Sequence, residues 1–267
     1  MNDAPIGVFD SGLGGMSVLR ELVRRLPHEN FVYVADSGHC PYGGKSQQQI
    51  IARAVAITDF LLGRGAKLIV VACNTATVAA VEYLRANYSN GFVGMEPAVK
   101  PAVALTRSGV VGVLATVATL SGEKLHKLID RHAGSVRIIT QPCPGLPERV
   151  EAGELESAET RVLVERYTAP LLAGGADVMV LGSTHYPFLR PLIQQVVGSE
   201  VKLLDTGEAV ARRVESVLAG DGNGDDLRAD RIGRGGVEWF SSSTPQHMQA
   251  IGSRLWGLPI AASALPL

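Results

Sequence analysis

The chain has 267 residues, of which 46% are hydrophobic and 19% charged, and this composition is typical of a globular protein with one large or two smaller domains. Its 25 basic and 26 acidic residues give a net charge of −1, which argues against nucleic acid or an anionic membrane as a partner. Three cysteines, without a signal-peptide pattern or a membrane-length apolar run, predict reduced thiols and a cytoplasmic location rather than a disulfide framework.

Short apolar strands alternate with amphipathic helices in the first third of the chain. Residues 6–9 predict a strand, and residues 16–26 predict a helix that Pro27 ends. Ser46 and Gln49 form a capping-box pattern ahead of the next helix. Further predictions are strands at 31–35 and 68–72 and a helix at 75–87.

The same alternation continues to the end of the chain. Predicted strands lie at 110–114, 136–139, 178–181 and 201–204, with helices between most of them. Residues 219–236 are rich in Gly, Asp and Arg and predict a solvated loop, followed by a strand at 237–241 and a closing helix at 244–256. Continuous apolar strands separated by amphipathic helices favour an α/β fold of parallel sheets covered on both faces.

A faint internal repeat relates the two halves of the chain. Residues 70–75 (VVACNT) resemble residues 180–185 (VLGSTH), and residues 7–11 (GVFDS) resemble residues 112–116 (GVLAT). Each segment is an apolar strand followed by small polar residues. Because ligands of open α/β sheets bind at the carboxyl ends of strands, the repeat predicts a site formed by two related lobes.

The glycine-rich segment at residues 10–15 (DSGLGG) follows the first strand and opens the first helix. Its simplest interpretation is a turn capped by Asp10. A dinucleotide fingerprint is an alternative, since Asp36 ends the next strand, but Ser17 stands where the third glycine belongs and Asp10 would place a carboxylate beside the pyrophosphate. A third interpretation is a strand-end carboxylate beside backbone amides that suit a small carboxylate ligand.

Cys73 follows the most apolar strand and stands at the start of a helix. A lone cysteine is by default a buried, inert thiol. A helix N-terminus favours an anion, however, and is expected to lower the pKa of this thiol from its usual value of about 8.5. The position therefore supports either an inert or a reactive thiol.

Polar residues also follow the strand at 178–181, in the segment 182–187 (GSTHYP). A lone histidine is usually structural, and the segment lacks the glycines of a nucleophile elbow. The six histidines form no metal-ligand spacing with the cysteines or with one another, so no metal site is expected. Residues 41–45 (PYGGK) predict a surface turn.

Taken together, these motifs are similar to those of the glutamate racemase family, within the aspartate/glutamate racemase superfamily. The matching stretches keep their order and span most of the chain: FDSGLGG (9–15), YVAD (33–36), PYG (41–43), ACNTAT (72–77), EP (96–97), VEAG (150–153) and THYP (184–187). None of these motifs is specific alone, and it is the ordered set that carries the resemblance.

The resemblance implies two similar lobes, each a mostly parallel sheet flanked by helices, with the active site between them. We expect residues 1–96 plus 207–267 to form the first lobe and residues 97–206 the second. The family uses no pyridoxal phosphate, metal or other cofactor and acts on a small-molecule substrate, here glutamate. The resemblance implies no nucleic-acid or membrane partner and leaves a homodimer open.

In this family two cysteines act on opposite faces of the substrate α-carbon, so that L- and D-glutamate interconvert and D-glutamate becomes available for peptidoglycan. Carried over, Cys73 is the first cysteine, and Asp10 assists it. His185, oriented by Glu151, would assist the second. The residues that would hold the ammonium and carboxylate groups of the substrate are Ser11, Pro41, Tyr42, Gly43, Asn74, Thr75, Thr119 and Thr184.

The sequence departs from the family pattern at Ser183, which occupies the position of the second cysteine. A hydroxyl is far less acidic than a thiol, so this change is expected to impair the reaction. Either an engineered Cys→Ser substitution or natural divergence explains it, and the intact neighbouring motifs favour the first.

Other classes of function remain as alternatives. An aspartate racemase, or a racemase for another amino acid, would share the two-lobed plan, and a catalytically impaired homologue could still bind glutamate. A dinucleotide-dependent oxidoreductase would leave Cys73 and Ser183 unexplained, and the fluorescence or absorbance of its cofactor would detect it. A cysteine hydrolase using Cys73, His185 and Asp10 would incorporate solvent oxygen, whereas a racemase exchanges only the α-hydrogen.

Overall fold

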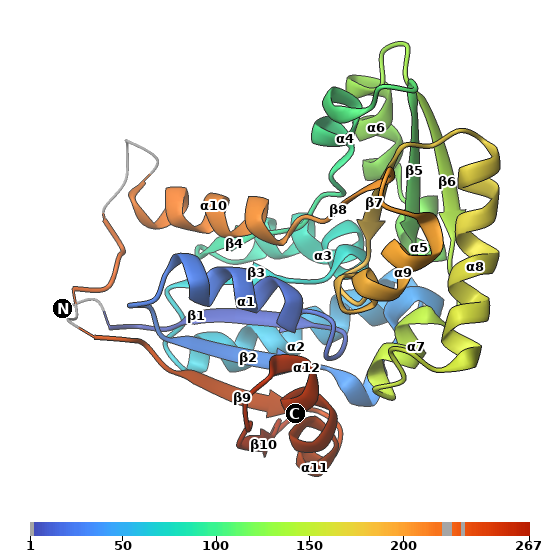
Figure 1. Cartoon of the computed structure of the whole chain (residues 1–267). Coiled ribbons are helices and arrows are strands. Elements are labelled where there is room, and N and C mark those ends of the chain that lie inside the picture. The colour runs from blue at the N-terminus through green and yellow to red at the C-terminus, as the bar shows by residue number, and fades with distance from the viewer. Residues whose placement is uncertain (1–2, 221–225, 231–232) are drawn as a thin grey trace. The chain divides into compact units, whose positions relative to one another are not determined.

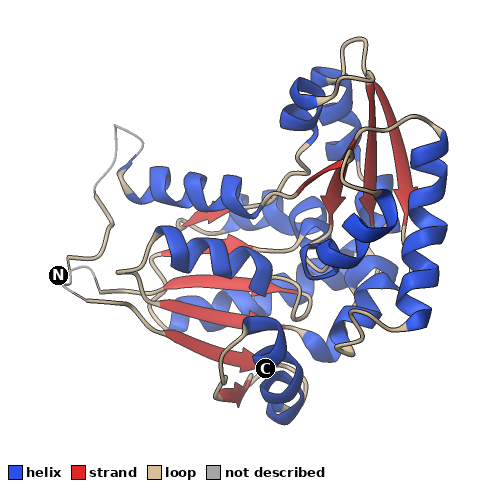
Figure 2. Ribbon diagram, in the orientation of Figure 1, coloured by secondary structure: helices blue, strands red, loops and turns tan. Residues whose placement is uncertain are grey.

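The computed structural model describes residues 3–220, 226–230 and 233–267. It forms two compact units, one made of residues 1–95 and 207–267 and the other of residues 96–206. Each unit contains a sheet whose described strand pairings are all parallel, with helices around it (Figure 2). The predicted fold class, two parallel sheets flanked by helices, is confirmed.

The sheet of unit 1 has the strand order β10-β9-β2-β1-β3-β4. Its central strands, β1, β2 and β3, are buried along their whole length, which explains their continuous runs of apolar residues. The strands are β1 (Ile6–Asp10), β2 (Phe31–Ala35), β3 (Leu68–Val71), β4 (Gly91–Val93), β9 (Val237–Ser241) and β10 (Ala262–Ala264).

Helices cover both faces of this sheet (Figure 1). The helices α1 (Met16–Arg25) and α10 (Gly207–Leu218) pack against each other on one face, and α2 (Gln47–Gly63) and α3 (Asn74–Asn87) pack together on the other. The capping box that the sequence predicts is present at the start of α2. The closing helical segment consists of α11 (Pro245–His247), a π-helical turn (Met248–Gly252) and α12 (Ser253–Trp256).

The sheet of unit 2 has the order β6-β5-β7-β8. The strands are β5 (Val110–Ala115), β6 (Arg137–Pro142), β7 (Val178–Gly182) and β8 (Lys202–Leu204). The helices are α4 (Val99–Leu105), α5 (Val117–Ser121), α6 (Glu123–His132), α7 (Leu146–Glu151), α8 (Ala158–Ala173) and α9 (Arg190–Val197). Among them α8 packs with α9, and α4 and α5 pack with α6.

The internal repeat seen in the sequence is a repeat of topology. The order β6-β5-β7-β8 in unit 2 matches β2-β1-β3-β4 in unit 1. The strands β1 and β5, which hold the same place in these two orders, each carry a glycine under a helical leucine. A Cβ on Gly7 would lie 3.0 Å from Leu61, and one on Gly112 would lie 2.7 Å from Leu171. These glycines allow a helix to pack closely on the sheet in both units.

Two strands, β4 and β10, are absent from the sequence prediction because neither shows a run of apolar residues. Each has three residues, and β10 is the sequence Ala-Ser-Ala at the edge of the sheet. The predicted loop at 219–236 includes residues 221–225 and 231–232, which lie outside the described residues, and its described part contains no strand and no α-helix. Among the described helices, none is long and apolar enough to cross a membrane.

Asp177, just before β7, anchors the turn between α4 and β5. Its Oδ2 accepts hydrogen bonds from the amides of Arg107 (2.8 Å) and Ser108 (3.0 Å), and the hydroxyls of Thr106 and Ser108 donate to Oδ1. Burial opposes ionisation of this carboxyl, but the hydrogen bonds outweigh it and lower its pKa to about 2. The ionised carboxylate therefore stabilises the turn.

Asp177→Asn is expected to lower the free energy of unfolding at pH 7 by about 1 kcal/mol, because charge-assisted hydrogen bonds become neutral ones. The folded pKa lies below the ordinary value of 3.8, so this stabilisation is complete above that value and is lost as the pH falls toward 2. Urea unfolding over this range should show the difference shrinking. The control is Asp130→Asn at an exposed position of α6, and a difference that persists unchanged at low pH would contradict the assignment.

Candidate active site

Cys73 lies at the C-terminal end of β3 and caps the N-terminus of α3. Its Sγ accepts a hydrogen bond from the amide of Ala76 (3.4 Å) and lies 3.7 Å from the hydroxyl oxygen of Ser11. Only 4% of the residue is exposed. The adjacent strands β1 and β3 thus bring Ser11 and Cys73, which are 62 residues apart in sequence, into contact.

Asp10 is the last residue of β1 and is fully buried. Its carboxylate accepts hydrogen bonds from the amide of Gly15 (2.6 Å) and the hydroxyl of Ser11 (3.3 Å). A Cβ on Gly15 would lie 2.6 Å from the Cβ of Asp10, so this approach requires glycine. The amide at the start of α1 therefore serves a side-chain carboxylate, which argues against the dinucleotide fingerprint.

The expectation that the helix N-terminus lowers the pKa of Cys73 is wrong. Burial of the thiol, followed by the negative charge of Asp10, raises this pKa well above its ordinary value. Hydrogen bonds from Ala76 and Ser11 act in the opposite direction but are outweighed. Desolvation disfavours the thiolate more than one helix terminus favours it, because almost no water reaches the sulfur.

Asn74 and Thr75 form the first turn of α3 and are both buried, with 5% and 6% of each residue exposed. The Oδ1 atom of Asn74 has no hydrogen-bond partner among the described residues. A buried carbonyl oxygen without a partner is costly unless a ligand supplies a donor. This atom, next to Cys73, is suited to accept a hydrogen bond from an ammonium group.

The segment Pro41–Gly43 of the sequence prediction forms the entry to a short 3₁₀ turn, Tyr42–Gly44. Tyr42 is 1% exposed, and its hydroxyl donates a 2.6 Å hydrogen bond to Asp36 at the end of β2. Its ring belongs to the same buried cluster as Cys73. Pro41 and Gly43 are half-buried on either side of it.

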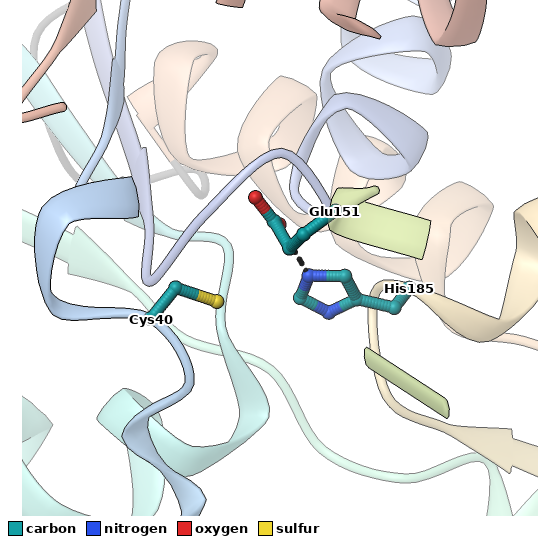
Figure 3. A group of neighbouring side chains, drawn as sticks. All are labelled: Cys40, Glu151 and His185. Carbon is teal, nitrogen blue, oxygen red and sulfur yellow. Dashed lines mark hydrogen bonds and ion pairs between the residues drawn. The ribbon is translucent and has the colours of Figure 1, made fainter. Parts of the chain in front are cut away.

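In unit 2, the carboxyl end of β7 carries Ser183, Thr184 and His185, all less than 7% exposed. The amide of His185 lies 3.4 Å from Ser183 Oγ. Its ring atom Nε2 lies 2.7 Å from Oε1 of Glu151, the last residue of α7, and Figure 3 shows this pair. This contact fixes the orientation of the imidazole ring.

Thr119 lies beyond the carboxyl end of β5, the neighbour of β7. It is fully buried in the first turn of α5, where its amide donates to Thr116 Oγ1 (3.2 Å) and its hydroxyl accepts from Thr116 (3.0 Å). Within unit 2, Thr119 therefore follows the carboxyl end of β5, and residues 183–185 follow that of β7. Glu151 comes from α7 and contacts His185. Within unit 1 the candidate residues follow β1, β2 and β3.

The sequence analysis missed two residues that contact this group of side chains. Arg53 pairs with Asp36 from the middle of α2, and Thr116 caps α5 in front of Thr119. Arg53 is one charged residue of an amphipathic helix, so no local pattern distinguishes it. Thr116 lies at the strand end that the internal repeat aligns with Ser11, and this alignment was the available signal.

Comparison with known proteins gives a consistent result. The family model described as Asp/Glu/Hydantoin racemase matches residues 6–214. The chain is 56% identical over 251 residues to the glutamate racemase of Herpetosiphon aurantiacus, covering 94% of this chain and 97% of that one.

Solved structures show the same relationship. A glutamate racemase from Bacillus anthracis superposes with a TM-score of 0.90 at 29% identity, covering 100% of this chain and 99% of that chain. The Escherichia coli glutamate racemase in complex with L-glutamate and the activator UDP-MurNAc-Ala superposes with a TM-score of 0.83 at 31% identity, covering 98% and 97% of the two chains.

Proposed function

We propose that this chain, which belongs to the Asp/Glu/Hydantoin racemase family, is a glutamate racemase that interconverts L- and D-glutamate by proton transfer at the α-carbon. The observation that carries the proposal is the buried cluster of Cys73, Ser11 and Asp10 at the carboxyl ends of β1 and β3. It offers a thiol and a neighbouring carboxylate, both of which are side chains that can act as a general acid or base in a proton transfer. The 56% identity to a glutamate racemase supports glutamate as the substrate.

In the proposed reaction the thiolate of Cys73 removes the α-proton of D-glutamate. The ammonium group of a bound amino acid favours this thiolate, because a positive charge opposes both the effect of Asp10 and the cost of burial. Asn74 Oδ1 is a suitable acceptor for that ammonium group. The Ser11, Thr75, Thr119 and Thr184 hydroxyls and the backbone of residues 41–43 are proposed to hold the carboxylates.

Residue 183 is proposed to act on the opposite face of the α-carbon, with His185 and Glu151 assisting it. The hydroxyl of Ser183 is a poor proton donor and acceptor at neutral pH, so the chain with Ser183 is proposed to be an impaired racemase. Its second candidate function is glutamate binding without turnover, which the Ser183 substitution specifically favours. By family resemblance no cofactor or metal takes part.

Several properties remain proposals by family resemblance. These are the supply of D-glutamate for peptidoglycan, a cytoplasmic location, a homodimer, and the assignment of units 1 and 2 as the two lobes that supply opposite sides of the reaction.

Calorimetry of the unaltered protein with glutamate and with aspartate tests the substrate assignment. D-Glutamate should bind, and D-aspartate about tenfold more weakly or worse, because hydrogen-bonding groups arranged for one carboxylate spacing are left unpaired by the shorter diacid. Equal or tighter binding of aspartate would assign the chain to aspartate instead. Absence of binding by both would contradict the proposed function.

A further inference from the structure

Asp36 is a fully buried carboxylate at the carboxyl end of β2, and hydrogen-bond donors surround it. Two of these groups come from the residues that follow Asp36 in sequence. The Tyr42 hydroxyl lies 2.6 Å from Oδ2 of Asp36, and Nδ1 of His39 lies 3.0 Å from Oδ1. Ser242, which follows β9, also donates to it. Asp36 thus links β2, the segment at residues 37–45 and the end of β9.

Arg53 completes this arrangement from α2. Its Nε and Nη2 atoms lie 2.9 Å and 2.8 Å from the two carboxylate oxygens of Asp36, which is a bidentate ion pair. The side chain of Arg53 is 21% exposed and that of Asp36 is fully buried. Such a pair balances the charge of the carboxylate and also fixes its direction. A lysine could balance the charge but could not fix the direction in this way.

The carboxylate that Arg53 orients in turn fixes Tyr42. Tyr42 donates its hydroxyl to the same oxygen, Oδ2, that accepts from Nε of Arg53. The ring of Tyr42 packs in the cluster that contains Cys73, while its backbone belongs to the turn between Pro41 and Lys45. A substitution of Arg53 is therefore expected to affect both the turn and the surroundings of the Cys73 thiol, through the side chains of Asp36 and Tyr42 alone.

We propose that Arg53 is a positioning residue for glutamate: through Asp36 and Tyr42, it holds the turn at residues 41–43 in the conformation that binds the substrate. This inference rests on the proposed function, in which that turn contacts glutamate. Arg53 itself contacts the substrate nowhere in this scheme. In this scheme the Arg53–Asp36 pair does more than neutralise the buried charge of Asp36. Its bidentate geometry also sets the direction of the hydrogen bond that Tyr42 donates to Asp36.

The test is calorimetric binding of D-glutamate to the unaltered protein (the parent) and to its Arg53→Met and Arg53→Lys variants. Arg53→Met should weaken binding about tenfold to a hundredfold, because a displaced turn loses a hydrogen bond to a charged group of the substrate, and one such bond contributes about this factor. Arg53→Lys should restore part of the loss, since it keeps the charge without the fork. Circular dichroism selects a temperature at which each variant is folded.

A pH series separates positioning from a general loss of stability. The Arg53 guanidinium, with Ser242 and Tyr42, outweighs burial and keeps the pKa of Asp36 low. Without the guanidinium, and with only His39, Tyr42 and Ser242 around it, the pKa of this carboxyl should rise, because fewer hydrogen bonds then oppose the effect of burial. Binding by Arg53→Met should then weaken further, relative to the parent, as the pH is lowered.

Two further variants complete the experiment. Arg64→Met, at the other end of α2 where Arg64 pairs with Glu238 on the surface, should bind like the parent. Tyr42→Phe should weaken binding, and combining it with Arg53→Met should add little, since both act through one contact. A parent that fails to bind glutamate contradicts the proposed function, whereas a parent that binds, with Arg53→Met or Tyr42→Phe binding equally well, overturns the role of Arg53.

Discussion

Ser183→Cys is expected to raise the rate of glutamate racemisation by about 10²–10⁴-fold, which is the usual contribution of one positioned acid or base group. Position 183 follows β7 as position 73 follows β3, and the two strands occupy equivalent places in their sheets. A thiol at position 183 would lie two residues before His185, whose amide is 3.4 Å from Ser183 Oγ and whose ring pairs with Glu151. It would be a far better proton donor and acceptor than the hydroxyl present.

Circular dichroism of L- and of D-glutamate over time measures this rate in both directions. Ser183→Ala should remain at the rate of the parent, and Ser199→Cys, at an exposed position of the same unit, should show that an added thiol elsewhere has no effect. Rapid racemisation by the parent would refute the two-thiol mechanism for this chain. Failure of Ser183→Cys to raise the rate, while glutamate still binds, would favour a binding protein without turnover.

Cys73→Ala is expected to abolish exchange of the α-hydrogen of D-glutamate with solvent. With Ser183 present, one face of the site still carries a thiol, so the parent should exchange this hydrogen slowly in D₂O while L-glutamate stays nearly inert. Removing the only thiol that contacts the Ser11–Asp10 pair among the described residues leaves no group to take the proton. The expected loss is again about 10²–10⁴-fold or to background.

Proton NMR of each enantiomer in D₂O follows this exchange directly. The matched control is Cys143→Ala, which removes another buried cysteine, one whose thiol donates to the backbone of Gln141. Cys143→Ala should exchange D-glutamate like the parent. Exchange that continues in Cys73→Ala would move the base to another residue and contradict the assignment of Cys73.

The sheets could be predicted from the sequence because their central strands are buried on both faces. The predicted strand at 68–72 is a run without a polar residue, and such a run has few alternatives to a central parallel strand. The edge strands β4 and β10 could not be predicted in this way. Their pairing depends on the neighbouring strand already present, and their own residues carry no pattern.

The candidate residues could be predicted from strand ends and family resemblance, but the direction of the pKa shift of Cys73 could not be predicted. The pKa of Cys73 depends on burial and on the distant Asp10, and both arise only when β1 and β3 lie side by side. Arg53 was missed for a related reason. Its partner Asp36 is 17 residues away, a separation with no helical or strand periodicity, so only the folded chain brings them together.

The division of unit 1 between the two ends of the chain has a consequence for its biosynthesis. Residues 96–206 are continuous and are all translated before β9, whereas β2 pairs on one side with β9, which is translated some 200 residues after it. Until then, β2 presents an unpaired apolar edge, which is a template for association with other nascent chains. We therefore expect truncation before β9 to leave unit 2 folded and unit 1 dependent on chaperones.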